Sequence, residues 1–243
     1  MRFSLFIVLF FSFLGLSAQS VRVWRDGHLQ YEAQSADSVV LGARLSPADV
    51  SEHLYVDLGL SVLWATCNVG ASEPQQTGDN FAWGETSAKD SYTEDAYLYG
   101  VGQRQDTLTD ASGYSYIVMT QSHYTDLGAD IAGTEHDAAT VQWGGEWRMP
   151  TLDEFVELRT QCQWEWTELK REQGYLITGP NGNSIFLPSS LDKMHPGGQY
   201  WTASASNESG MAECLNFIPS LAILYCAPRY QGLTIRPVLP REH

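Results

Sequence analysis

The sequence predicts an α+β fold with short antiparallel strands, two short helices and long loops. Three observations predict it. Apolar and polar residues alternate in several short segments, which is the period of a strand. Turn signals rich in Gly, Pro, Asn and Asp separate these segments, and one segment carries a strong helix-start signal. The chain of 243 residues is 43% apolar and includes eight Trp and twelve Tyr, which is enough apolar surface for a folded core.

The first 18 residues resemble a secretory signal peptide. Arg2 gives a positive start, residues 3–16 are uncharged and mostly apolar, and Ser17 and Ala18 are small residues at the exit. A membrane anchor is the alternative, but a bilayer core takes roughly 20 apolar residues to span. We therefore expect cleavage after Ala18 and export to the periplasm, the cell surface or the medium, with no transmembrane segment left.

The charge balance narrows the classes of partner. The chain has 14 Lys and Arg against 29 Asp and Glu, a net charge of -15 at pH 7. Nucleic-acid binding depends on clustered basic side chains that release counterions from phosphates, so this balance disfavours a nucleic-acid partner. Four cysteines in a chain of this length also disfavour a small domain held together by disulfides.

Residues 19–45 are predicted to form a small β extension. Asp26-Gly27 is a strong hairpin signal, and it would place Trp24 and Leu29 opposite each other. Residues 37–41 are predicted to form a third strand. The two strands of the hairpin are expected at Val21–Trp24 and His28–Tyr31.

A linker, residues 46–53, separates this extension from the main domain, residues 54–240. At the start of that domain apolar residues alternate with polar ones from Val56 to Trp64, the period of a half-buried strand. Residues 65–135 are rich in Gly, Ser, Thr, Asp and Tyr. They are predicted to form long loops with short strands such as Asn80–Trp83.

A capping box marks the start of one helix. Thr151 stands at the N-cap and Glu154 three residues later, so each side chain can bond to the backbone of the other. The expected apolar stripe of this helix is Leu152, Phe155, Leu158 and Cys162.

Two hairpins and a last strand are predicted after this helix. Trp164 and Trp166 alternate with polar residues, so one face of a strand would carry both rings. The expected strands are Tyr175–Thr178 with Ser184–Leu187 around Gly179–Gly182, Met211–Phe217 with Leu221–Cys226 around Pro219-Ser220, and Gly232–Val238.

Several ordered motifs in residues 54–240 carry a family resemblance. The segment from Asp137 to Phe155, which contains Trp-Arg-Met-Pro-Thr, resembles the formylglycine-generating-enzyme branch of the C-type-lectin-like fold. A closer resemblance is to the Fibrobacter succinogenes major paralogous domain family. The N-terminal hairpin that ends in Asp37-Ser38 also resembles a leader module common in exported proteins of gut bacteria. The motifs similar to the major paralogous domain family are Val56–Ala65, Gly78–Glu85, Trp147–Thr151, Gly179–Pro188, Tyr200–Ser204 and Gly232–Val238.

This resemblance implies a C-type-lectin-like domain in an exported, often surface-exposed bacterial protein. Relatives with this fold include variable proteins that carry their binding face on C-terminal strands and loops. Fold alone does not give function, so the binding face is an expectation. On that basis the expected ligand-binding residues are Asn207, Glu208, Asn216, Tyr225, Arg229 and Tyr230.

Tyrosines in the polar loops have two interpretations. Exposed tyrosines among Asn, Ser and Gly are typical of adaptable binding surfaces. Alternatively, the rings cover a loop-rich core. Both interpretations stay open for Tyr92, Tyr97, Tyr99, Tyr114, Tyr116 and Tyr124.

The four cysteines are expected to be structural. None has the spacing of a zinc site, with a second Cys or a His three or four residues away. Enzymes of the formylglycine-generating branch use a close cysteine pair, whereas Cys214 and Cys226 lie twelve residues apart. These two would be bridged across the last hairpin if its turn has an odd number of residues. Cys67 and Cys162 would pair or stay buried.

No metal or cofactor is expected. Sugar binding through calcium in this fold needs a Glu-Pro-Asn or Gln-Pro-Asp loop and a Trp-Asn-Asp triplet, and the sequence has neither. The segment Glu135–Asp137 would offer ligands for calcium, but helix N-capping by Asp137 explains it equally well. No spacing singles out a catalytic pair among the remaining candidates, which are Glu85, Glu146, Glu154, His123, His136 and His195.

The sequence therefore predicts an exported, non-enzymatic binding module that recognises a protein or a glycan through C-terminal loops. One alternative is a structural component of the envelope or of fimbriae, in which the extension of residues 19–45 docks a neighbour. The other is a thiol-oxidising enzyme in which Cys214 and Cys226 form a redox pair.

Overall fold

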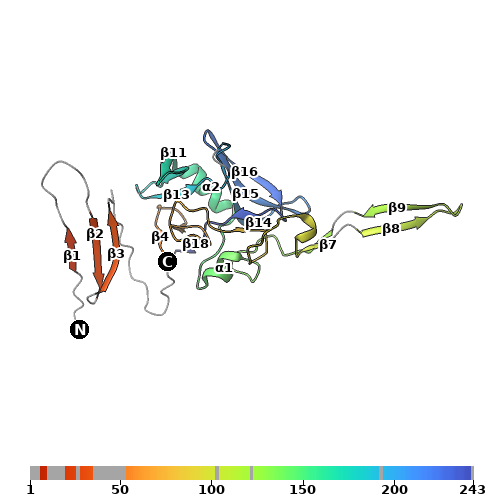
Figure 1. Cartoon of the computed structure of the whole chain (residues 1–243), viewed down its shortest axis with the longest axis horizontal. Helices are drawn as coiled ribbons and strands as arrows, with labels where there is room; N and C mark the ends of the chain where they lie inside the picture. The colour runs from red at the N-terminus through yellow and green to blue at the C-terminus, as the bar shows by residue number, and fades with distance from the viewer. Residues whose placement is uncertain are drawn as a thin grey trace. The chain divides into compact units, whose positions relative to one another are not determined.

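The computed structural model divides the chain into two units, Met1–Ala43 and Arg44–His243, and each is described by itself. Figure 1 shows the helices and strands. Of the predicted linker, only His53 lies among the described residues. The described residues are 6–9, 20–25, 28–34, 53–101, 104–120, 123–191 and 194–241.

The first unit contains a three-stranded antiparallel sheet in the order β1-β2-β3. The predicted hairpin is confirmed, since β2 pairs with β3 and Trp24 lies opposite Leu29. The strand β1 comes from the segment predicted to be a signal peptide, so a cleaved chain would keep only β2 and β3. The third strand predicted at residues 37–41 lies outside the described residues. The strands are β1 (Phe6–Leu9), β2 (Ser20–Arg25) and β3 (His28–Gln34).

The largest sheet of the second unit has five strands in the order β16-β15-β14-β17-β6. β14 and β17 are parallel, and the other neighbours are antiparallel. The predicted hairpin around Pro219-Ser220 is confirmed, with Ile218 opposite Leu221. The strands are β6 (Asn80–Phe81), β14 (Gly198–Ala205), β15 (Met211–Ile218), β16 (Leu221–Pro228) and β17 (Leu233–Thr234).

The second unit also contains smaller sheets. One has the order β11-β12-β13 and confirms the predicted hairpin around Gly179–Gly182, with Trp164 and Trp166 on β11. Another, β18-β5-β4, joins the end of the domain to its start. The strands are β4 (Tyr55–Val56), β5 (Val62–Ala65), β7 (Gly100–Val101), β10 (His123–Tyr124), β11 (Gln163–Leu169), β12 (Glu172–Thr178), β13 (Ser184–Pro188) and β18 (Val238–Pro240).

The described residues form two α-helices, α1 (Ala138–Trp143) and α2 (Leu152–Gln161), and one 3-10 turn, Glu94–Ala96. Together with the sheets they give an α+β arrangement rich in strands, as the sequence predicts. Neither helix is long and apolar enough to cross a membrane.

Two apolar cores lie on opposite faces of the largest sheet. On one face Leu215 and Phe217 of β15 pack with Phe155 of α2. On the other face Cys214 belongs to the core that contains Ala139 of α1. This alternation follows from the period of a strand, because successive side chains point to opposite faces.

Two predicted strands are each interrupted by residues that belong to no strand, 57–61 and 235–237, so these two predictions are wrong as continuous strands. Between Val56 and Val62 the chain turns, because Asp57 accepts a hydrogen bond from Gly59 N at 2.7 Å and Gly59 has a φ of +79°. The predicted alternation of burial nevertheless holds from residue 58 to residue 64. The predicted strand Gly232–Val238 is divided between β17 and β18.

A further hairpin lies where the sequence predicted long loops. β8 (Arg104–Thr109) pairs with β9 (Ser115–Thr120) along its whole length. The turn is held by Asp110, whose Oδ1 accepts from Ser112 N at 2.9 Å and from Tyr114 N at 3.1 Å. The side chains described in this hairpin, residues 107–117, are exposed.

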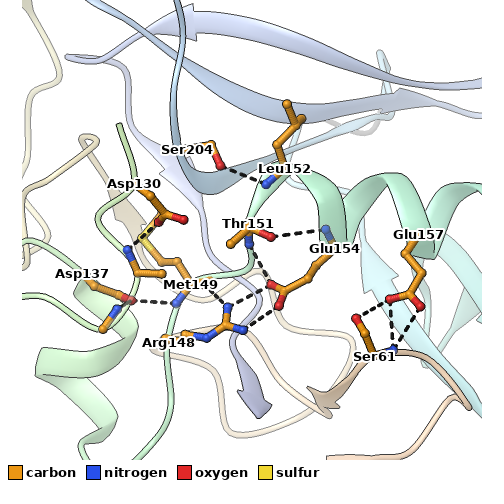
Figure 2. Close-up of polar contacts among 12 residues, drawn as sticks. Ser61, Asp130, Asp137, Arg148, Met149, Thr151, Leu152, Glu154, Glu157 and Ser204 are labelled. Atoms are coloured by element: carbon orange, nitrogen blue, oxygen red, sulfur yellow. Dashed lines mark hydrogen bonds and ion pairs between the residues drawn. The ribbon is translucent and has the colours of Figure 1, made fainter. Parts of the chain in front are cut away.

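A polar network fixes the start of α2, and Figure 2 shows it. The capping box is confirmed: Thr151 Oγ1 accepts from Glu154 N at 3.3 Å, and Glu154 Oε2 accepts from Thr151 N at 2.8 Å. Arg148 donates to both carboxylate oxygens of Glu154, at 2.9 and 2.5 Å. Leu152 N donates to Ser204 Oγ at 3.0 Å and so links the helix to β14. The Arg-Met-Pro-Thr segment therefore has a structural role, since it fixes the start of α2 and its position against β14.

Asp137 is the N-cap of α1 and is completely buried. Its Oδ1 accepts from Ala139 N and Thr140 N, at 2.8 and 3.1 Å. Its Oδ2 accepts from Gly133 N and Met149 N, at 2.9 and 2.8 Å, and Figure 2 shows the last of these bonds. Burial raises the pKa of Asp137, and the backbone donors act in the opposite direction. The capping interpretation of this residue is confirmed.

Candidate binding surface

The six predicted binding residues lie in two separate places. Four of them occupy two neighbouring segments, the β14–β15 turn and the residues that follow β16. These segments are joined by Arg229, whose backbone N donates to Gly210 O at 2.8 Å. The other two lie further along the β15–β16 hairpin. The first group is Asn207, Glu208, Arg229 and Tyr230, and the second is Asn216 and Tyr225.

Arg229 supports the surface from inside. Its side chain is 8% exposed, and its guanidinium lies 4.5 Å from the centre of the Trp83 ring. Its Nε donates to Met211 O at 3.1 Å. Burial lowers the pKa of Arg229, while Tyr97 and Asp126 act in the opposite direction. These contacts assign Arg229 to the scaffold rather than to direct ligand contact.

Three loop tyrosines cluster next to Arg229. The ring of Tyr97 lies 5.8 Å from that of Tyr99 and 6.0 Å from that of Tyr124. Tyr97 is buried and donates through its hydroxyl to Trp83 O at 2.7 Å. Tyr99 and Tyr124 are half-buried. Of the two interpretations of the loop tyrosines, burial therefore applies to Tyr97, and the other two rings border the surface.

The half-buried tyrosines have polar partners. Tyr124 donates to Glu94 Oε1 at 3.0 Å, and the Tyr99 hydroxyl lies 3.1 Å from His136 Nδ1. Burial and the Glu94 carboxylate raise the pKa of Tyr124 to about 12. This phenol therefore stays protonated at neutral pH and remains a hydrogen-bond donor.

Tyr124 also connects the loops of this surface. Its ring lies against Gly210, where an added Cβ would stand 2.2 Å from Cε2 of the ring. Gly210 has a φ of +74°, so glycine suits both the backbone and the close contact. Tyr230 is near enough to Tyr124 to influence its ionisation. We call the resulting set the tyrosine surface: Glu94, Tyr99, Tyr124, Asn207, Glu208 and Tyr230.

The second group lies on one face of the β15–β16 hairpin. Tyr225 is opposite Cys214, and Asn216 is opposite Ile223, so these side chains share a face. Tyr225 is 53% exposed and Asn216 is partly buried. Tyr225 and Arg229 are four positions apart in the sequence, and a strand rises about 3.3 Å per residue, so the pair of Tyr225 and Asn216 lies well away from the tyrosine surface.

All four cysteines are free, so the proposed pairings are not formed. The hairpin turn has two residues, and the register places Cys214 opposite Tyr225 and Cys226 opposite Glu213. The two thiols therefore point to opposite faces of the sheet. Burial raises the pKa of Cys214 to about 12. A buried thiol with a raised pKa, whose hairpin neighbour Cys226 points to the other face, is unsuited to thiolate chemistry.

Two of the three acidic residues weighed as catalysts, Glu85 and Glu154, have structural partners, and Glu146 is exposed. Glu85 pairs with Lys89 at 2.7 Å and accepts from Leu98 N at 2.8 Å. Glu154 serves the capping box. No cluster of three or more His, Cys, Asp or Glu in the described part of the chain is placed to hold a metal ion.

A polar groove of about 640 Å³ was not expected from the sequence. It lies between the loop of residues 70–79 and the β11–β12 turn, and Gln75, Asp79 and Lys170 are among its lining residues. Lys170 reaches across to Glu73 Oε2 at 3.1 Å. The two segments that line the groove are about 90 residues apart in sequence, so no local sequence pattern indicates the groove.

Comparison with protein-family models, curated proteins and solved structures finds no match to this chain. An assignment of function therefore rests on the sequence motifs and on the geometry of the tyrosine surface.

Proposed function

We propose that the chain is an exported, non-enzymatic binding module that takes a protein or glycan ligand on the tyrosine surface. The observation that carries this proposal is the cluster of half-buried tyrosine rings at the meeting point of several loops. Tyrosine offers a large apolar ring and a polar hydroxyl at a small cost in conformational entropy, which suits a contact surface.

Buried contacts support this surface. Arg229 is held between Trp83 and the backbone of Met211, and Tyr97 anchors the neighbouring loop through its bond to Trp83 O. Side chains fixed by buried neighbours lose little freedom when a ligand arrives, and this favours affinity. Loops carried by such a framework are common places for binding residues.

The ligand that this surface favours is rich in hydrogen-bond donors. Glu94 and Glu208 supply carboxylates beside the rings, and Asp126 is close enough to Arg229 to influence its ionisation. The whole chain is acidic as well. Sugar hydroxyls, or a protein face rich in Lys and Arg, match these acceptors, whereas a strongly acidic ligand would be repelled at low salt.

We further propose a C-type-lectin-like fold for the second unit. Three features support it: the pairing of β18 with β5 near the two ends of the domain, the capped helix after the Arg-Met-Pro-Thr segment, and long loops between short strands. In relatives of this fold a C-terminal binding face is carried by such loops.

The test is a glycan array probed with the exported chain, once in calcium and once in EDTA. We expect saturable hits that persist in EDTA, because the surface uses tyrosines and carboxylates without a metal. The Tyr99→Ala and Tyr124→Ala variants should weaken those hits by about tenfold or more, as expected for anchor side chains. Tyr114→Ala is the matched control, since Tyr114 is 70% exposed on the β8–β9 turn.

Two results would contradict the proposal. Hits that disappear in EDTA would point to a metal-dependent site elsewhere. If Tyr114→Ala weakens the hits as much as Tyr124→Ala does, the ligand does not bind at the tyrosine surface. If the array gives no hits, the same variants are compared against captured envelope proteins, and equal capture by all of them would refute the site.

A further inference from the structure

The edge of the largest sheet carries an uncharged strand. β16 is the last strand in the order β16-β15-β14-β17-β6, and among the described strands β15 is its one neighbour. Figure 1 shows β15 and β16 together at this end of the sheet. The segment from Phe217 to Pro228 contains no charged residue, although the chain as a whole has a net charge of -15. A long, apolar edge strand of this kind is a template for pairing with another strand.

The hairpin register shows which backbone groups face outward. Ile218 and Leu221 flank the two-residue turn, and in such a hairpin this pair exchanges both hydrogen bonds. Alternate residues of β16 then bond to β15, and the residues between them direct N–H and C=O away from it. The outward residues are Ala222, Leu224 and Cys226.

One face of the same hairpin is uncovered near its turn. The opposite face is covered, since Leu224 packs against the core that contains Phe155 of α2. On the uncovered face three apolar residues are close to half exposed: Ile218 at 46%, Leu221 at 50% and Tyr225 at 53%. The hairpin thus combines unpaired backbone groups with an exposed apolar face.

We propose that β16 is a self-association edge, at which a second copy of the chain adds its own β16 in antiparallel orientation. The register with Leu224 opposite Leu224 of the second copy brings every outward residue opposite another outward residue. Ala222 then lies opposite Cys226 of the second copy, and the reverse holds by symmetry. Shifting the strands by two residues would leave outward groups of each copy without partners. The proposal does not involve the tyrosine surface.

Two properties of the strand favour a second copy as its occupant. A two-fold pairing is self-complementary, because each contact occurs twice. In the proposed register Ile223 lies beside Tyr225 of the second copy, and β-branched and aromatic residues form favourable cross-strand pairs. Two chains of net charge -15 repel each other, and they can approach most closely where both are uncharged.

The net negative charge of the chain predicts how the affinity of the dimer depends on salt concentration. Repulsion between the two copies acts over several ångströms and is screened by ions, whereas the ladder and the apolar contacts are not ionic. The dimer should therefore tighten as salt increases. An interface held by ion pairs would show the opposite trend.

The first experiment is sedimentation velocity on the exported chain from micromolar to millimolar concentration. We expect a monomer–dimer equilibrium whose Kd falls by about threefold or more between low and high salt. The Tyr225→Lys variant should shift it toward monomer by about tenfold or more. Tyr114→Lys is the matched control and should leave it unchanged. A monomer at all concentrations, or a dimer that weakens with salt, would overturn the proposal.

A cysteine variant tests the register directly. Ala222→Cys places a new thiol opposite the native Cys226 of the second copy, and mild oxidation should give a covalent dimer on a non-reducing gel. Within one copy these positions lie four residues apart on an extended strand, about 13 Å, which is too far for a disulfide. The unmodified chain and Ala222→Ser are the controls. A dimer in solution with no cross-link above these controls would overturn the register, and an added strand from another protein would then be the alternative occupant.

Discussion

Arg236 shows how one buried cation can organise several segments. Its side chain is completely buried between β17 and β18, and burial lowers the pKa of its guanidinium. It donates to Asn68 Oδ1 at 2.7 Å and to the carbonyls of Ala65, Thr66 and Phe186 at 2.9 Å each. A planar group with several donors can satisfy acceptors in this fixed arrangement, whereas an ammonium cannot reach them all.

Replacing Arg236 with Lys should therefore be strongly destabilising. We expect Arg236→Lys to lower the free energy of unfolding by about 2–4 kcal/mol, because buried carbonyl oxygens lose their donors. Denaturant unfolding followed by tryptophan fluorescence measures this. Arg159→Lys, at an exposed position of α2, should change the free energy by no more than about 0.5 kcal/mol. Equal effects of the two variants would contradict the role assigned to Arg236.

At the scale of elements, local signals predicted hairpins and helix starts well. The turn at Pro219-Ser220 and the capping box at Thr151 are encoded within a few residues, so the sequence alone reveals them. The β8–β9 hairpin was missed because β8 is almost entirely polar and the apolar residues of β9 are consecutive rather than alternating. The breaks after Val56 and before Val238 were missed because distant partners help to fix both of them. Asn183 donates to Asp57 O beside the local Asp57–Gly59 bond, and Arg236, at the second break, donates to Phe186 O.

The capping box gives a prediction about α2. Thr151→Ala removes the acceptor for Glu154 N, so we expect a loss of about 1 kcal/mol in the free energy of unfolding. Thr160→Ala, near the exposed end of the same helix, replaces a poor helix former with a good one and should be neutral or slightly stabilising. Thermal unfolding of both variants measures the difference. If Thr151→Ala is as neutral as Thr160→Ala, the cap contributes nothing.

At the scale of the whole molecule, the arrangement of the predicted binding residues could not be read from the sequence. Six residues near the C-terminus were grouped by resemblance, and the structure separates Tyr225 from Tyr230. The side-chain period of β16 and the packing of loops against Gly210 decide that separation. Tyr99 and Tyr124 join the surface through contacts between loops that lie about 100 residues from Tyr230. No local pattern contains that information, and the groove beside Lys170 was missed for the same reason.

The central claim is that ligand binding belongs to the tyrosine surface and self-association to the edge of β16. The most direct test measures, for one ligand, the Kd of the Tyr230→Ala and Tyr225→Ala variants at a concentration where the chain is monomeric. We predict that Tyr230→Ala raises the Kd by about tenfold or more and that Tyr225→Ala leaves it unchanged. The reverse result, with Tyr225→Ala losing the ligand and Tyr230→Ala retaining it, would contradict the account and place the binding site on the hairpin.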